Sequence, residues 1–313
     1  MSYSQITIAK NCTIRSLSAS DSEGLSQKLH AIKLDPYECF KQSSTTAGFV
    51  LNQKFNPGLL KEIHNVRNHK LDCLIIKGLP ISFDILKDTP ISDSVPQGKD
   101  FVSEMVLLGL SKILNTRPYL NIEEKDGSII QQVIPLANRE NTASGGGFKK
   151  AFHSHTENVH EESPPDLFML ICLRGNEHAQ TTFISIEQLM AGLPTWVREG
   201  MKKRDFIFRT GPSYSKTFKR RGSILDLNES NQWEIRYNAN PGRIEPCNYQ
   251  AQKVMAFLDT FLQDKRNLNF ICLEKGDCII LNNKRALHGR TTFKDDVYSP
   301  QKRWLQRIYL HRK

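Results

Sequence analysis

The sequence contains no apolar run long enough to cross a membrane. Its longest apolar stretches, such as DLFMLICL (166–173), are about as long as a strand, whereas a membrane helix needs about 20 apolar residues. The N-terminus MSYSQITIAK has no basic segment followed by an apolar one, so we expect no secretory signal. The seven cysteines include no CxxC pair. Such a scattered, odd-numbered set predicts reduced thiols in a cytoplasmic protein with no membrane partner.

The chain also lacks the motifs that usually accompany nucleic-acid binding, despite a net charge of +10. Its densest basic run, KTFKRRGS (216–223), is short, and no zinc finger, aromatic RNA-binding motif or basic heptad helix accompanies it. We therefore interpret this run as a solvated basic loop and expect no nucleic-acid partner. A basic surface could still guide anionic small molecules toward a cleft.

Internal repeats and low-complexity segments are absent, and the 39% apolar and 24% charged fractions indicate an ordinary globular protein. The spacing of apolar residues predicts a helix over 56–69, a buried strand over 71–80 and a second, largely buried helix over 101–116. Helical patterns recur at 185–204, where Pro194 must break or bend the helix, and at 249–266. Short strand-like runs dominate from about residue 118: GSIIQQVIP, DLFMLICL, TTFISI, WEIRYN, LNFICL, DCIILNN and RWLQRIYLH.

Many short strands with few helices predict a mainly β protein with flanking helices and a jelly-roll core, the double-stranded β-helix. We expect a single domain over 1–313. Within it, 1–70 would form an N-terminal extension or helical buttress, and about 118–313 would form the jelly-roll core with helical insertions. The sequence predicts no particular oligomeric state.

The segment AFHSHTENVHEE (151–162) concentrates side chains that can bind metals. If it is extended, His155 and Glu157 point to the same side, and His288, just beyond the CIILNN strand, could complete a set of ligands. Two histidines and one carboxylate leave three positions open and typically select Fe(II) for oxygen chemistry. Spacing alone leaves two alternatives open, a polar loop and a zinc site using His153, His155 and His160.

A second pattern lies near the C-terminus, where Arg303 and Arg307 flank Leu305 in a strand-like run. Strand alternation points all three side chains to one side. Arginine suits paired hydrogen bonds to a carboxylate. Two arginines inside a barrel would be costly without anionic ligands, so this pattern predicts carboxylate ligands.

Three blocks, 152–186, 275–293 and 302–312, together resemble the Fe(II)/2-oxoglutarate-dependent oxygenases. They contain SHTENVHEESPPDLFMLICLRGNEHAQTTFISI, KGDCIILNNKRALHGRTTF and KRWLQRIYLHR. The resemblance is greatest to the clavaminate synthase-like branch, related to the taurine dioxygenases (TauD), which includes asparagine and arginine hydroxylases. It implies an iron-dependent dioxygenase with 2-oxoglutarate and O2 as cosubstrates.

Carried over onto this sequence, the resemblance implies roles for individual residues. The iron ligands would be His155, Glu157 and His288. Arg303 would bind the distal carboxylate of 2-oxoglutarate with help from Thr181, and Arg307 would bind the substrate's α-carboxylate. The candidate substrate contacts are Asn158, Gln132 and Asn238. We also expect SGGGFKK (144–150) to form a lid beside the metal, and Asn282, where the family commonly has Asp, to alter a contact behind the ligands.

The resemblance further implies that the substrate is a free amino acid or a derivative. The WEIRYNAN strand has Arg236 and Asn238 in place of acidic residues, which favours a neutral or acidic side chain. Hydroxylation of an unactivated C–H bond is the expected reaction, with desaturation or cyclisation as the alternative of the same class. A non-catalytic or zinc-binding barrel is the alternative of a different class.

Overall fold

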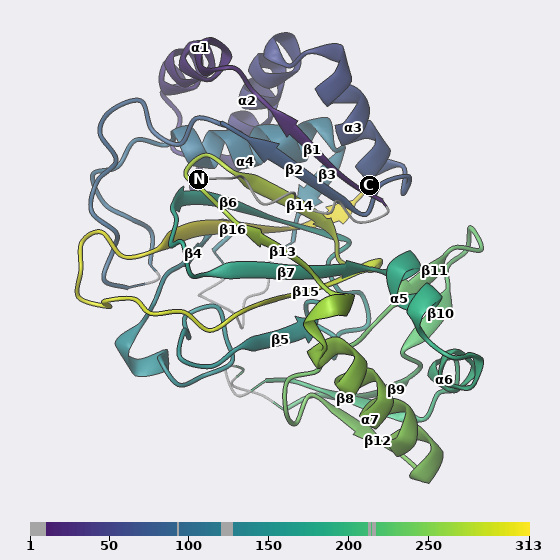
Figure 1. Ribbon diagram of the computed structural model, residues 1–313. Helices are drawn as coiled ribbons and strands as arrows, with labels where there is room; N and C mark the ends of the chain where they lie inside the picture. The colour runs from purple at the N-terminus through teal and green to yellow at the C-terminus, as the bar shows by residue number, and fades with distance from the viewer. Residues whose placement is uncertain (1–10, 93, 120–127, 212–213, 215–216) are drawn as a thin grey trace.

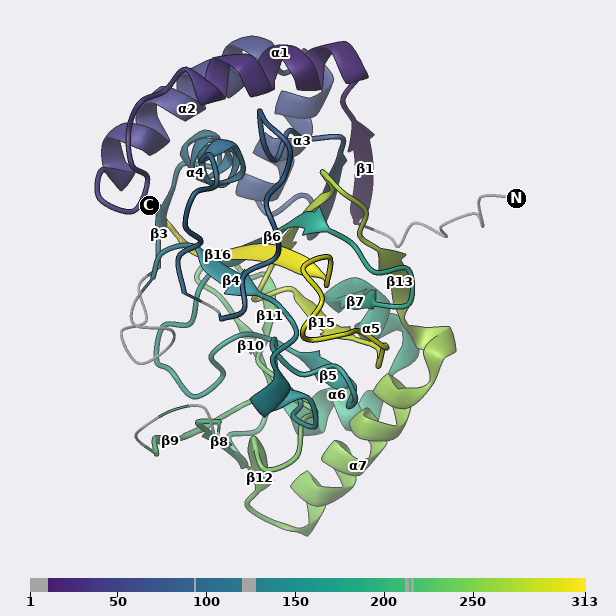
Figure 2. The same cartoon turned by 90° about the vertical axis from the view of Figure 1, so that its left-hand side faces the viewer.

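The computed structural model describes residues 11–92, 94–119, 128–211, 214 and 217–313. The beginnings of the runs GSIIQQVIP and KTFKRRGS therefore lie outside the described residues. The structure is layered: four N-terminal helices, a large sheet, a smaller sheet, and then short strands with the last long helix (Figure 1). Figure 2 shows that the N-terminal helices and α7 lie at opposite ends of the molecule.

Helices occupy the places that the apolar spacing predicts. Helix α3 begins after Asn56, whose side chain accepts a hydrogen bond from the Leu59 amide. The helix predicted over 185–204 is broken at Pro194, as expected. The helices in the described part of the chain are α1 (Ala19–His30), α2 (Phe40–Lys54), α3 (Pro57–Arg67), α4 (Val102–Ile113), α5 (Ile186–Gly192), α6 (Thr195–Met201) and α7 (Tyr249–Gln263).

The large sheet lies under the N-terminal helices. Its strand order is β1-β2-β14-β6-β16-β3, with β4 also paired to β16. Buried side chains of α1 to α4 pack on its outer face, and only Lys112 of the twelve residues of α4 is not buried. The strands are β1 (Cys12–Ser16), β2 (Cys73–Lys77), β3 (Thr116–Pro118), β4 (Gln131–Val133), β6 (Leu167–Arg174), β14 (Cys278–Asn282) and β16 (Trp304–Arg312).

The smaller sheet faces the inner side of the large one. It has the order β13-β7-β15-β5, formed by β5 (Phe152–His155), β7 (Gln180–Ser185), β13 (Asn269–Cys272) and β15 (Ala286–Arg290). A buried cluster joins the two sheets, with Phe168 and Leu305 from the large sheet against Phe183 and Ile271 from the small one. The candidate site lies between these sheets.

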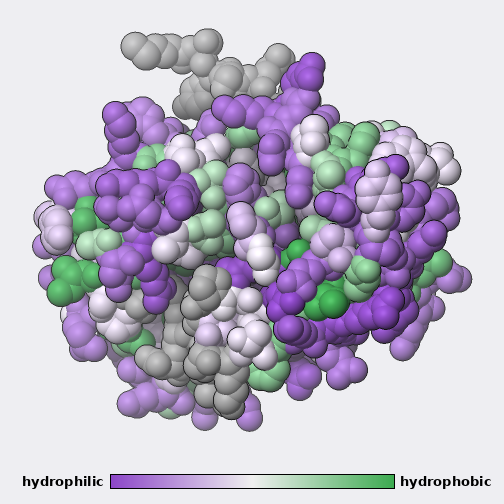
Figure 3. Space-filling view, turned by 90° about the horizontal axis from the view of Figure 1, so that it is seen from below, coloured by the Kyte–Doolittle hydropathy of each residue, from purple (hydrophilic) through white to green (hydrophobic). Residues whose placement is uncertain are grey.

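Short strands and the last helices form the third layer. They comprise β8 (Phe206–Arg209), β9 (Lys219–Gly222), β10 (Leu225–Leu227), β11 (Trp233–Ile235) and β12 (Ile244–Pro246), in the orders β12-β8-β9 and β10-β11. A separate apolar cluster joins them to α5, α6 and α7. The face seen from below, in the direction of this layer, is mostly hydrophilic (Figure 3).

The overall class differs in one respect from the sequence-based prediction. The strand-rich centre and the flanking helices are present, but the described chain is mixed α/β with seven α-helices, and its sheets do not close into a continuous barrel. Helices α1 and α2 lie within the predicted N-terminal extension or buttress, but their individual positions were not predicted because their hydrophobic patterning is weak. None of the helices described is long and apolar enough to cross a bilayer.

Candidate active site

Three metal-capable side chains meet between β5 and β15. His155 ends β5 and lies directly across from His288, the central residue of β15. Glu157 follows in the turn after β5, with its Oε1 3.3 Å from Nε2 of His288 and 4.0 Å from Nε2 of His155. One ligand atom from each residue lies within 4.8 Å of the other two. His288 therefore lies beyond the end of the CIILNN strand, β14, as predicted, and it is part of the next strand, β15.

Hydrogen bonds orient this triad. Nδ1 of His155 lies 2.7 Å from the carbonyl oxygen of His153, which can only accept, so Nδ1 bears the proton and Nε2 presents a lone pair. That Nε2 is buried and has no hydrogen-bond partner in the described structure. A buried nitrogen aimed at a carboxylate and a second imidazole, with nothing to bond, fits a metal ligand.

Glu157 is held by a residue that the sequence did not point to. The side chain of Asn283 accepts a hydrogen bond from the Glu157 amide at 2.7 Å and donates to the carbonyls of Glu157 at 3.3 Å and Pro165 at 2.9 Å. Asn282, which we expected behind the ligands, instead lies 3.4 Å from Nδ1 of His69. Asn283 therefore fixes the backbone that carries the carboxylate.

The electrostatics of the triad suit a divalent cation. Burial, followed by the neighbouring His288, lowers the pKa of His155 to about 3. Burial alone would raise the pKa of Glu157, but the charge of Arg307 and the hydrogen bond from His288 hold it well below its usual range. At neutral pH His155 is thus a neutral imidazole and Glu157 an ionised carboxylate, the forms that bind metals. The residues fit Fe(II).

The alternative zinc site finds no support in the geometry. His153 is exposed and contributes its carbonyl rather than its ring, and His160 stacks edge-on against Tyr214. Within the described ranges, the only group of three potential ligands that could hold an ion is His155, Glu157 and His288.

A small, narrow pocket beside His288 is lined by Thr181, Arg290 and Arg303. Arg303 is 5% exposed and Arg290 7%. Both guanidinium groups lie over the ring of Phe293, at 5.4 and 5.0 Å. Burial, followed by the charge of Arg303, lowers the pKa of Arg290 to about 9. Neither arginine pairs with a carboxylate side chain of the described chain, so this pocket favours an anion.

A larger pocket of about 130 Å³ adjoins the first, and its lining includes His155 and Glu157 of the triad. Arg307 lines both pockets. Its Nε lies 3.0 Å from Oε1 of Gln131, and its Nη1 lies 3.4 Å from Oε1 of Glu157. The larger pocket includes Asn158 and Asn238, as proposed from the sequence, and residues that we did not propose: Arg139, Arg209, Arg243 and Tyr214.

The structure also bears on two further expectations, the substrate contact of Gln132 and the position of the glycine-rich segment. Gln132 is turned away from the pocket and accepts a hydrogen bond from Nε1 of Trp304 at 2.8 Å. Its neighbour Gln131 faces the site, because successive side chains of a strand point to opposite faces. The glycine-rich segment does lie beside the metal triad, with Gly145 and Gly146 in the lining.

The comparisons with known proteins agree with this geometry. The model of the family "Taurine catabolism dioxygenase TauD, TfdA family" matches residues 42–309. The chain belongs to this family. It is 24% identical over 240 residues to an L-asparagine oxygenase of Streptomyces coelicolor, covering 76% of this chain and 70% of the relative. It is 23% identical over 252 residues to clavaminate synthase 2 of Streptomyces clavuligerus, covering 76% and 73%.

Solved structures show the same fold. The structure of asparagine oxygenase with Fe(II), 3-hydroxyasparagine and succinate has a TM-score of 0.82 at 22% identity and covers 95% of this chain and 92% of that one. The non-haem iron oxygenase OrfP with iron and α-ketoglutaric acid has a TM-score of 0.79 at 19% identity, with coverages of 96% and 95%. The resemblance inferred from the three sequence blocks is therefore confirmed at the level of the family.

Proposed function

We propose that this protein is an Fe(II)/2-oxoglutarate-dependent oxygenase that hydroxylates a free amino acid or a derivative. The observation that carries the proposal is the buried triad of His155, Glu157 and His288, in which Nε2 of His155 has no hydrogen-bond partner in the described structure. Two adjoining cationic pockets, each lined in part by the triad, fit two anionic small molecules. Relatives named for amino-acid oxidation support the substrate class.

In this proposal His155, Glu157 and His288 hold the iron. With 2-oxoglutarate bound, the metal supplies the activation of O2 and the oxidation of a C–H bond, while 2-oxoglutarate is converted to succinate and CO2. The protein positions both molecules and excludes water from between them. Hydroxylation, rather than desaturation or cyclisation, stays our expectation.

Each pocket then has an occupant. Arg303 binds the distal carboxylate of 2-oxoglutarate. Thr181 and Arg290, which face each other across β7 and β15, assist it. Arg307 binds the α-carboxylate of the amino acid, because Gln131 holds its guanidinium at the larger pocket beside Glu157. Asn158 and Asn238 offer hydrogen bonds to the rest of the substrate.

We also assign the core to the double-stranded β-helix, because two facing, largely antiparallel sheets enclose the site and the similar solved structures are iron oxygenases. The division into an N-terminal buttress and a core within one domain remains part of this proposal. So does a cytoplasmic location, which the seven unpaired cysteines suit.

The proposal is tested by adding Fe(II) and 2-oxoglutarate anaerobically to the metal-free protein and recording the visible charge-transfer band. We expect a band that requires both components and is lost in His288→Ala. The matched control His153→Ala, which removes an exposed ring, should keep the band. A band that survives His288→Ala, or no band in the unaltered protein, would refute the assignment.

A further inference from the structure

We infer that the side chain of the amino-acid substrate ends in a carboxylate, and that Arg243 binds it. This inference rests on the proposed function and narrows its substrate class. It concerns the larger pocket, at a position separate from Arg307, which is assigned to the α-carboxylate.

The backbone fixes the position of Arg243. The residue follows the turn of Asn240 to Gly242, where Gly242 has a φ of +75°, and directly precedes β12. Its carbonyl accepts a hydrogen bond from the Arg209 amide at 2.8 Å. The side chain therefore leaves from the junction of β8 and β12 and lines the larger pocket.

Glycine at position 211 allows the guanidinium group to lie where it does. A Cβ atom added to Gly211 would be 1.8 Å from Nη1 of Arg243 and 2.4 Å from its Cζ. The cation thus lies directly against the backbone at 211, and any larger residue there would displace it.

The guanidinium of Arg243 has no counter-charge within the described chain. Its side chain forms no ion pair and no hydrogen bond with a described residue, although it is partly buried. Arg209, in the same pocket, contrasts with it because it pairs with Glu245. An unpaired, partly desolvated cation facing a pocket favours an anionic ligand.

The rest of the lining argues against a basic substrate. Glu157 is the single acidic residue among the described residues that line the larger pocket, and it belongs to the metal triad. A lysine or arginine side chain would therefore meet Arg243 without a carboxylate to bind it. An amide side chain could donate and accept there but would leave the cation uncompensated.

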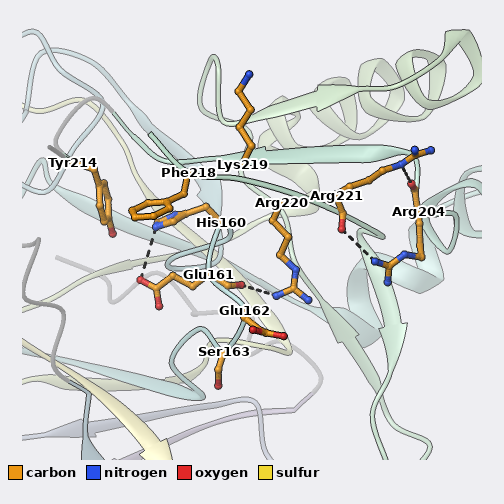
Figure 4. Close-up of a pocket in the computed structure, with 10 residues that line it drawn as sticks. All are labelled: His160, Glu161, Glu162, Ser163, Arg204, Tyr214, Phe218, Lys219, Arg220 and Arg221. Atoms are coloured by element: carbon orange, nitrogen blue, oxygen red, sulfur yellow. Dashed lines mark hydrogen bonds and ion pairs between the residues drawn. The ribbon is translucent and has the colours of Figure 1, made fainter. Parts of the chain in front are cut away.

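A basic outer pocket adjoins this site. It shares His160 and Tyr214 with the larger pocket. Figure 4 shows Tyr214 and Phe218 close to His160, with the basic side chains along the other side. Those side chains are Arg204, Lys219, Arg220 and Arg221, against the acidic Glu161 and Glu162. The surplus of positive charge would raise the local concentration of an anionic substrate.

The test uses the full protein with Fe(II) and 2-oxoglutarate under anaerobic conditions. L-aspartate, L-glutamate, L-asparagine, L-glutamine and L-lysine are titrated separately, and each Kd is taken from the change in the visible band. We expect one of the two acids to bind at least about 10-fold more tightly than its amide, because a hydrogen bond to a charged group is worth more than a neutral one.

Two variants make the assignment specific. Arg243→Gln should weaken binding of the preferred acid about 10- to 100-fold while changing that of its amide little. Gly211→Ala should also weaken binding of the preferred acid relative to its amide, since the added methyl group displaces the guanidinium of Arg243 without removing it. The control Arg198→Gln removes the same charge from α6, outside the pockets, and should change neither Kd.

The outcomes separate this inference from the proposed function. If no band forms in the unaltered protein, the oxygenase assignment fails. If the band forms but an amide or lysine binds more tightly than both acids, the function stands and the inference is overturned. An Arg243→Gln variant that binds the preferred acid as tightly as the unaltered protein would also overturn it.

Discussion

Replacement of Asn283 by alanine should weaken both the fold and the metal site. Asn283 is 1% exposed and makes three hydrogen bonds with backbone groups, two of them with Glu157. At about 1 kcal/mol for each buried bond, the free energy of unfolding should fall by about 3 kcal/mol. Because the ligand's backbone is no longer held, iron affinity should fall by about 10- to 100-fold.

The assay compares two adjacent asparagines. Asn282→Ala removes an equally buried side chain, whose contacts are with His69 and the Lys284 amide and not with Glu157. Denaturant titration gives the stability of each variant, and anaerobic competition with a chelator gives its Fe(II) affinity. Both variants should be less stable, but only Asn283→Ala should lose iron affinity. Equal loss of iron affinity in the two variants would refute the orienting role.

Three other expectations concern distinct parts of the structure. Burial, and to a smaller extent the charge of Arg312, lowers the pKa of His69 to about 4, so the unfolded chain binds a proton more readily than the folded chain does. As the pH falls from 6.5 to 4, the free energy of unfolding should therefore decrease by about 1 kcal/mol, after allowance for exposure. Denaturant titrations of His69→Asn should show a smaller dependence of stability on pH. Nζ of Lys99 lies 2.6 Å from Oε2 of Glu104, and the two side chains are 1% and 0% exposed. Lys99→Met would leave Glu104 buried without a cation, so the free energy of unfolding should drop by about 3–5 kcal/mol. A double variant that adds Glu104→Leu should recover stability, and one no more stable than Lys99→Met alone would contradict this. Gly147→Ala would place a methyl group 1.9 Å from the backbone carbonyl oxygen of Thr142. The resulting shift of the glycine-rich loop would misplace the pocket wall, so turnover of 2-oxoglutarate with substrate should fall by up to about 100-fold. Unchanged turnover would contradict this prediction.

The sequence predicted those parts of the site that lie in one strand or follow a strong pattern. Alternation along β16 placed Leu305 and Arg307 on the inner face, and the structure confirms it, while Gln306 bonds to Glu104 of α4 on the outer face. The alternation of side chains along β4 could not be used in the same way, because the sequence does not show which of its residues face the site. A shift of one residue separates Gln131, which holds Arg307, from Gln132, which does not.

Residues that come together only through tertiary structure could not be found in this way. Arg209 and Arg243 are 34 positions apart, and antiparallel pairing of β8 with β12 brings them to one pocket. Arg290 is two residues after His288, yet its place beside Arg303 depends on how β15 faces β16. Neither arginine lies in a pattern whose spacing signals a ligand, so only the packed structure reveals them.

The distribution of charge around the triad joins these observations. Buried arginines are costly in an apolar interior unless anions neutralise them, and Glu157 is the single carboxylate among the described lining of the two inner pockets. Among the described residues, no carboxylate side chain therefore pairs with Arg243, Arg290 or Arg303, and their charge becomes balanced when anionic molecules bind. Arg290 and Arg303 require one anion on the side of His288, and Arg243 and Arg307 can hold the two ends of another beside His155. The net charge of +10 thus has a local counterpart in pockets sized for small molecules, which is why a dicarboxylic amino acid fits this site better than a basic one.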